Sequence, residues 1–186
     1  MVSVKKLSLI ALPALFLTTT TQAYEMHLGA GLNYYSVKYL TGDAQIDSTR
    51  ETGSAYHFSW GLRNSFGESK RHFIGAGLDI DDIAGKRVLG LKAIDYQYAL
   101  TDSFRLGAFI GAASMDSGLP QNGYYYGASG TLLELLGTFD LIAEFRYGSG
   151  LARDRILEDD PDDPILGRPD IFNNYYSAAL SLSYRF

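Results

Sequence analysis

The tripeptide His57-Phe58-Ser59 carries the most enzyme-like chemistry in the sequence. Residues i and i+2 of a β-strand point to the same face, so an imidazole and a hydroxyl spaced this way would be neighbours. A Ser–His pair supported by a carboxylate can cleave an ester by nucleophilic catalysis. The alternative, which we favour, is two polar side chains hydrogen-bonded in a protein interior. We therefore expect no catalytic residue and no enzymatic activity.

The acidic run at residues 158–163 is the strongest candidate for metal binding. Clustered carboxylates on oxygen-rich turns can hold Ca²⁺, but the run has neither the spacing nor the glycine of an EF-hand loop. The two nearby prolines favour an extended loop. A solvated acidic loop is the simpler interpretation, so we expect no metal site and no bound cofactor.

A larger set of charged residues occupies alternate positions along the predicted strands, so that these residues share one face of the sheet. Buried charges need partners, and arginine offers carboxylates a bidentate geometry. Six acids and five bases nearly balance, which favours a packing role over a catalytic one. We expect Glu25 and Arg185 at the same end of the first and last strands. One set of bridges would join Glu144 and Arg146 to Asp95 and Arg63. The full set is Glu25, Asp79, Asp81, Asp95, Asp140, Glu144, Arg63, Arg71, Arg105, Arg146 and Arg185.

Period-two alternation, which is typical of β-strands, positions these charges. One face of each segment is apolar and the other is small or polar. Residues 88–92 alternate poorly, which indicates a bulge or a late start. Residues 132–136 have an ambiguous phase, and a short helical turn could form there. The eight predicted strands are residues 24–35, 56–63, 74–81, 94–100, 104–111, 124–132, 139–147 and 175–186.

The predicted connections alternate in length, as in outer-membrane barrels. Those at 64–70, 100–103 and 136–138 are short, those at 36–52 and 149–171 are long, and those at 82–87 and 115–121 are intermediate. A soluble sandwich also alternates, with its apolar face inward. Glycines on the polar face and aromatic residues at the strand ends favour the opposite orientation. A sheet in hydrocarbon must close, because an open edge leaves backbone groups unpaired.

Composition and the N-terminus support this interpretation. The 186 residues suit one domain, and a mean hydropathy of −0.06 argues against a helical membrane bundle. A net charge of −5 argues against nucleic acid as a partner, and zero Cys excludes disulfides. Lys5 and Lys6, the apolar stretch 7–17 and Thr21-Gln22-Ala23 together predict a signal peptide. We expect cleavage of residues 1–23 and one barrel domain over 24–186.

The last residues carry a family resemblance. Leu182, Tyr184 and the terminal Phe186 alternate in a way that resembles the assembly signal of bacterial outer-membrane barrels. Across 24–186 the pattern is similar to the small eight-stranded group, the OmpA transmembrane domain and the OmpX/Ail-like proteins. This resemblance implies an all-β fold, an eight-stranded antiparallel transmembrane up-and-down β-barrel. It also implies the outer membrane of a Gram-negative bacterium, the barrel assembly machinery as a partner, and contact with outer-membrane lipid and lipopolysaccharide.

Three functions remain open from the sequence. The first is a non-enzymatic, monomeric scaffold that contacts a surface ligand through its loops, with Arg153, Arg155 and Arg168 near lipopolysaccharide phosphates. The second is a narrow porin-like conduit, although eight strands leave room only for side chains. The third is a lipid A-modifying enzyme. Lipid A deacylases use a similar His-x-Ser pair, but theirs precedes Asn on a late strand and faces lipid, whereas Trp60 follows here.

Overall fold

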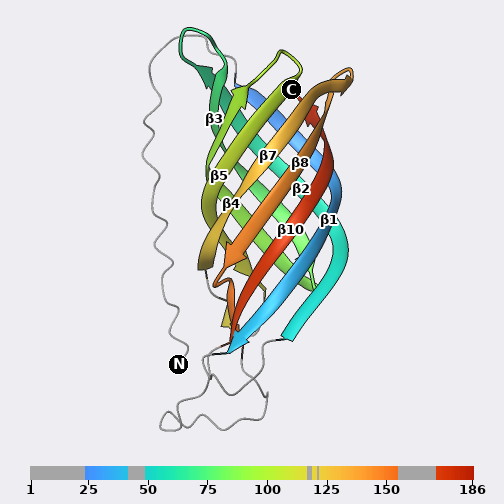
Figure 1. Cartoon of the computed structure of the whole chain (residues 1–186), viewed down its shortest axis with the longest axis vertical. Coiled ribbons are helices and arrows are strands. Elements are labelled where there is room, and N and C mark those ends of the chain that lie inside the picture. Colours follow the sequence, from blue (N-terminus) through green and yellow to red (C-terminus); the bar gives the residue numbers. More distant parts are fainter. Residues whose placement is uncertain (1–23, 42–48, 117–118, 121, 155–170) are drawn as a thin grey trace, which may run out of the picture.

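A computed structural model describes residues 24–41, 49–116, 119–120, 122–154 and 171–186, so the predicted signal peptide lies outside it. The chain forms a closed antiparallel barrel of eight long strands (Figure 1). Consecutive long strands are neighbours, and β1 pairs with β10 to close the sheet. The long strands are β1 (Glu25–Thr41), β2 (Thr49–Phe66), β3 (His72–Ile83), β4 (Lys86–Ala99), β5 (Phe104–Met115), β7 (Asn122–Leu136), β8 (Phe139–Ser149) and β10 (Ile171–Arg185). No described segment forms a helix that is long and apolar enough to cross a membrane.

The two ends of the barrel differ. At the turn end, short turns join β2 to β3, β4 to β5 and β7 to β8. At the loop end lie the longer connections and two short strands, β6 (Leu119–Pro120) and β9 (Ala152–Asp154). The predicted intermediate connection at 82–87 is shorter than expected, because only Ala84 and Gly85 separate β3 from β4. Their φ angles of 53° and 70° match the tight hairpin turn that continues the twist of its strands.

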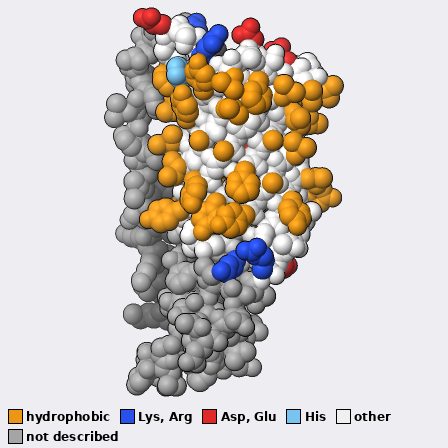
Figure 2. Space-filling view, viewed as in Figure 1, with side chains coloured by type: hydrophobic (Ala, Val, Ile, Leu, Met, Phe, Trp, Pro, Cys, Tyr) orange, Lys and Arg blue, Asp and Glu red, His pale blue; other side chains and the backbone are white. Residues whose placement is uncertain are grey.

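The apolar face points outward, as the sequence predicts. Leu32 is 61% exposed and Tyr56 is 72% exposed, although both are large and hydrophobic. Figure 2 shows hydrophobic side chains over much of the barrel wall that faces the viewer. Aromatic rings mark both borders of this apolar band. Phe139 contacts Tyr184 at the turn end, with ring centroids 5.4 Å apart. At the loop end Tyr147 lies 5.2 Å from Tyr126 and 4.7 Å from Tyr176. This is the exterior of a transmembrane barrel.

Beyond the loop-end tyrosines the polarity of the alternation inverts. Tyr35 and Val37 are buried and face inward, while Ser36 and Lys38 take the outward positions. The predicted long connection at 36–52 was therefore wrong in extent. β1 continues to Thr41 and β2 begins at Thr49. The physical reason is that these strand ends leave the apolar band, so their outward residues are polar.

One bulge in β4 and one register shift in β7 explain the irregular stretches. The shifts between Gly75 and Gly77 and between Lys92 and Ile94 are the two sides of the β4 bulge, which reverses the phase of that strand. Before the shift Leu91 faces outward and Lys92 inward; after it Ile94 faces outward. Residues 132–136 form no helical turn. They belong to β7, with a register shift before Leu136 and a positive φ of 57° at Glu134.

An apolar layer fills the lumen toward the loop end. Its members come from β1, β3, β4, β5, β7 and β10 and from the residue that follows Gly150. Phe109 and Tyr125 pack within it, with ring centroids 5.2 Å apart. Both rings lie in segments predicted as strands, whereas Val37, Ile83 and Leu151 lie in segments predicted as connections. The layer comprises Tyr35, Val37, Ile83, Val88, Phe109, Ala113, Met115, Tyr125, Leu151 and Tyr175.

Candidate functional site

A buried charge network occupies the middle of the lumen, next to the apolar layer. Its centre is Lys92 on β4. The Lys92 ammonium lies 2.6 Å from Glu144 Oε1 on β8 and 3.1 Å from Asp79 Oδ2 on β3. Tyr125 donates a 2.6 Å hydrogen bond to the same Asp79 oxygen. One ammonium therefore holds two carboxylates from different walls of the barrel.

Arg146 forms the second centre of the network. Its guanidinium donates to both oxygens of Asp81, at 2.9 Å and 3.2 Å, across the lumen from β8 to β3. Arg146 Nε donates to Ser177 on the adjacent strand β10. Asn33 also donates to Asp81, and His57 Nδ1 lies 2.9 Å from it. Bidentate pairing and added hydrogen bonds are what a buried carboxylate needs to remain charged.

Two further pairs lie closer to the turn end. Arg63 bonds Asp95 through Nε at 2.8 Å and through NH2 at 2.8 Å. Arg105 on β5 spans the lumen to Glu25 on β1, with three contacts of 2.8–3.1 Å. The Arg105 guanidinium also lies 3.7 Å from the centre of the Phe73 ring. Together these groups occupy the part of the lumen toward the turn end with side chains in contact.

Most predicted interior residues lie inside, but the bridges suggested for Glu144 and Arg146 are wrong. Glu144 bonds Lys92, not Arg63, and Arg146 bonds Asp81, not Asp95. Glu25 and Arg185 lie at the same end of β1 and β10, as predicted, and Glu25 bonds Arg105. Arg185 instead contacts Glu134 at 3.0 Å and Asp140 at 3.8 Å. Register along a strand follows from sequence, whereas contacts across the lumen depend on how the closed sheet is staggered.

The predicted set of inward charges was wrong at two residues. Arg71 is exposed because it lies in the turn before β3, outside the alternating segment. Lys92 is buried and was missed, because the bulge after it reverses the strand phase. The sequence held a signal of this bulge. Leu89 and Leu91 are apolar at odd-numbered positions, which puts Lys92 on the inward face, whereas the next apolar residue, Ile94, is at an even-numbered position. The predicted balance of six acids to five bases is kept, since Lys92 takes the place of Arg71.

The His57–Ser59 pair faces inward, as predicted. His57 is 1% exposed and Ser59 is 7% exposed. The Nδ1 atom of His57 lies 2.9 Å from Asp81 and 3.1 Å from Arg146, so its hydrogen bonds go to the charge network and not to Ser59. A nucleophile needs both its base and access to substrate. This arrangement supplies neither, and it matches two polar interior residues.

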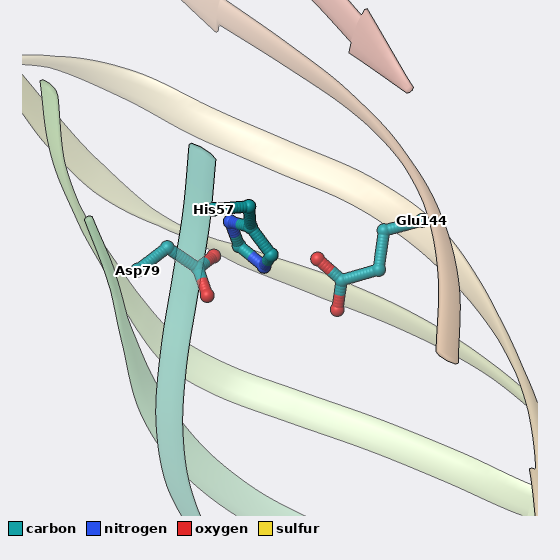
Figure 3. A group of neighbouring side chains, drawn as sticks. All are labelled: His57, Asp79 and Glu144. Atoms are coloured by element: carbon teal, nitrogen blue, oxygen red, sulfur yellow. The ribbon is translucent and has the colours of Figure 1, made fainter. Parts of the chain in front are cut away.

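His57, Asp79 and Glu144 could together offer three ligand atoms to a cation, since these atoms lie within 4.8 Å of one another. Figure 3 shows the imidazole between the two carboxylates. The Lys92 ammonium already bonds both carboxylates. A positive charge of the chain itself thus fills the position that a metal ion would take. The acidic run at 158–163, Arg155 and Arg168 lie outside the described residues.

The predicted assembly residues lie at the turn end of β10. Leu182 and Tyr184 face outward, and the Phe186 ring packs edge-on against Tyr184 with centroids 4.8 Å apart. The Phe186 amide donates to the Met26 carbonyl on β1. The terminal residue thus lies at the seam where the first and last strands close the barrel.

The closed sheet, apolar wall and filled lumen define a small eight-stranded transmembrane β-barrel. Among solved structures, Ail of Yersinia pestis in complex with the heparin analogue sucrose octasulfate is similar, with a TM-score of 0.50 and 14% identity over 88% of this chain and 99% of that one. Neisserial surface protein A is also similar, with a TM-score of 0.47 and 12% identity over 87% and 97%. These likenesses concern the fold. No family model and no curated protein sequence matches the chain.

Proposed function

We propose that the chain is a non-enzymatic protein of the Gram-negative outer membrane that makes contacts at the cell surface through its loop end. The observation that carries this proposal is the polar sheet that β1, β2 and β10 build beyond the loop-end tyrosines. β1 has 17 residues and β2 has 18, whereas a membrane-crossing strand needs about 9–11. The additional residues of β1 and β2 therefore extend as paired strands beyond the apolar band, so the part outside the membrane includes β-sheet as well as connecting loops.

The projecting part of β2 also offers a pairing edge. Pairing of β2 with β1 extends to Thr49, but its pairing with β3 begins only at His57. Among the described residues, 49–56 of β2 thus have a partner strand on one side alone. Such an edge presents N–H and C=O groups to an extended segment of another protein. Charged Arg50 and Glu51 on this edge disfavour self-association.

The interior supports this proposal over both alternatives. The apolar layer and the charge network fill the lumen that a conduit would keep open. The buried His57 and Ser59 have no route to a lipid substrate. We expect His57→Ala to leave the acyl chains of lipid A unchanged in mass spectra of cells that express it. A lost or gained acyl chain that depends on His57 would favour the enzyme.

Single cysteines test the proposed surface contact, because the chain contains no Cys. Thr52→Cys lies on the β2 edge, and the matched Thr101→Cys lies in a turn at the opposite end. A membrane-impermeant maleimide should label Thr52→Cys in intact cells and label Thr101→Cys only after the outer membrane is opened. A photocrosslinker at position 52 should then capture extracellular protein, whereas one at 101 should not. Equal labelling at both positions in intact cells would contradict the orientation.

A further inference from the structure

A hollow in the lipid-facing wall distinguishes one side of the barrel from the other. It has a volume of about 700 Å³ and is lined by residues of β1, β2, β5, β7, β8 and β10. Small outward residues form its floor, and larger exposed ones form its rim. The floor is Ala128, Gly130, Ala143 and Ala178, and the rim includes Leu32, Tyr34, Leu106, Phe145 and Leu180.

The strand register explains the depth of this hollow. Ala143 pairs with Gly130 and Ala128 pairs with Ala108, so small residues adjoin across neighbouring strands. Ala178 lies between the larger rim residues Tyr34 and Phe145. On the other side of the barrel the same level carries large pairs, such as Leu78 with Leu91. Figure 2 shows the hollowed side: large apolar side chains form two bands, with small side chains and backbone between them.

A pair of cationic side chains lies beyond the hollow, toward the loop end. Lys38 on β1 and Arg50 on β2 are directly opposite each other, both on the outward phase. Like charges so placed destabilise a sheet unless an anion lies between them. Neither makes an ion pair with another residue that the structure describes. The pair is therefore suited to an anionic group supplied from outside the chain.

The position of this pair corresponds to lipid headgroups. Ser36 pairs with Tyr176 in the row of tyrosines that ends the apolar band. Lys38 follows two residues later, about 7 Å further along the strand. The headgroup region on each side of a bilayer is about 5–8 Å thick. In Figure 2 Lys and Arg side chains gather just beyond the lower apolar band.

We propose that this surface binds one lipid A molecule, with a phosphate between Lys38 and Arg50 and an acyl chain in the hollow. The choice of lipid A rests on the proposed function, which places the loop end in the outer leaflet, where lipid A is the phosphate-bearing lipid. The tyrosine row separates the two parts of the site and lies at the level where acyl chains meet headgroups. The proposed site combines two cationic side chains that bind a phosphate with an apolar hollow that binds an acyl chain.

Native mass spectrometry of the purified full chain in detergent, with added lipid A, tests the proposal. Lys38→Gln with Arg50→Gln should weaken retention of one lipid A by roughly tenfold, since each cation contributes to binding an anionic surface. Exposed Arg71→Gln at the turn end is the matched control and should retain lipid A as the wild type does. Ala143→Phe, which fills the hollow, should also weaken retention. Ala76→Phe, outward on β3, is its control.

Each variant is first checked for a folded barrel by its heat-dependent mobility in SDS gels. The proposal is overturned if either the charge variant or the groove variant retains lipid A as the wild type does. It is also overturned if phosphatidylglycerol is retained equally well, or if the hollow instead joins two copies that Ala143→Phe separates. The orientation is tested independently by labelling of Thr52→Cys, so a failure of the proposed function is recognised separately.

Discussion

At the residue scale, Lys92 determines how the lumen is held together. Its ammonium bonds Asp79 and Glu144, which come from strands four apart in the order of the barrel, on opposite walls. The lysine side chain is 4% exposed, so water screens these contacts little. Without the ammonium, two carboxylates would remain close together with no cation between them.

Replacing Lys92 by Met keeps most of the side-chain volume and removes the charge. We expect Lys92→Met to lower the free energy of unfolding by about 3–5 kcal/mol, the usual cost of breaking a buried pair. Urea titration of the barrel in lipid vesicles, followed by gel mobility, measures the change. Exposed Lys70→Met in a turn is the control and should alter stability by less than about 0.5 kcal/mol. Equal effects of the two substitutions would show that Lys92 is not a central contact.

The sequence predicted which charges face inward better than which charges meet. Arg63, Arg105 and Arg146 were placed correctly because each lies in a clean alternating segment. Their partners were predicted poorly, because the stagger of a closed sheet decides which residues face each other across the lumen. Lys92 was missed because a one-residue bulge reverses the phase that an alternation argument relies on.

At the element scale, the bulge in β4 and the glycines beside it act together. Gly111 on β5 pairs with Lys92, and a Cβ at Gly111 would overlap the Leu91 carbonyl oxygen. The close approach of β4 to β5 thus requires a residue with no side chain.

The loop-end extensions of the strands were missed by the sequence analysis. At Ser36 and Val37 the outward residue is polar and the inward residue is apolar, which is the reverse of the pattern used to predict the strands, so this part of β1 was predicted as a connection.

We expect Gly111→Val to destabilise the barrel by about 1–3 kcal/mol or to prevent folding, because the backbone must move to admit the side chain. Ala112→Val adds a similar bulk to the next residue, which faces outward, and should be tolerated. The yield of heat-modifiable barrel after refolding compares the two variants. A Gly111→Val protein that refolds as efficiently as Ala112→Val would contradict the close approach of β4 and β5.

The terminal aromatic residue should matter more for assembly than for stability. The Phe186 ring is 67% exposed and packs mainly on Tyr184, so Phe186→Ala should cost the folded barrel only about 0.5–1.5 kcal/mol. In cells we expect a much larger fall in the amount of assembled protein. Phe66→Ala, another exposed aromatic near the turn end, is the control. Normal outer-membrane levels of Phe186→Ala would refute the assembly role.

At the scale of the whole molecule, the closed barrel is divided into an apolar exterior and a filled interior. The number of strands, their order and the outward apolar face follow from the alternation, because each long strand crosses the apolar band once. The two-part filling of the lumen did not follow from the sequence. Val37, Ile83 and Leu151 lie in segments that the sequence analysis predicts as connections.

Planar-bilayer conductance of the purified wild-type chain distinguishes a filled barrel, which acts at its surface, from a pore. The apolar layer and the cross-lumen pairs occupy the lumen with side chains, so we predict only rare, small and flickering events. Lys92→Met, which loosens the network, should raise their frequency. Large, stable channels in the wild type would contradict the account and establish the conduit in its place.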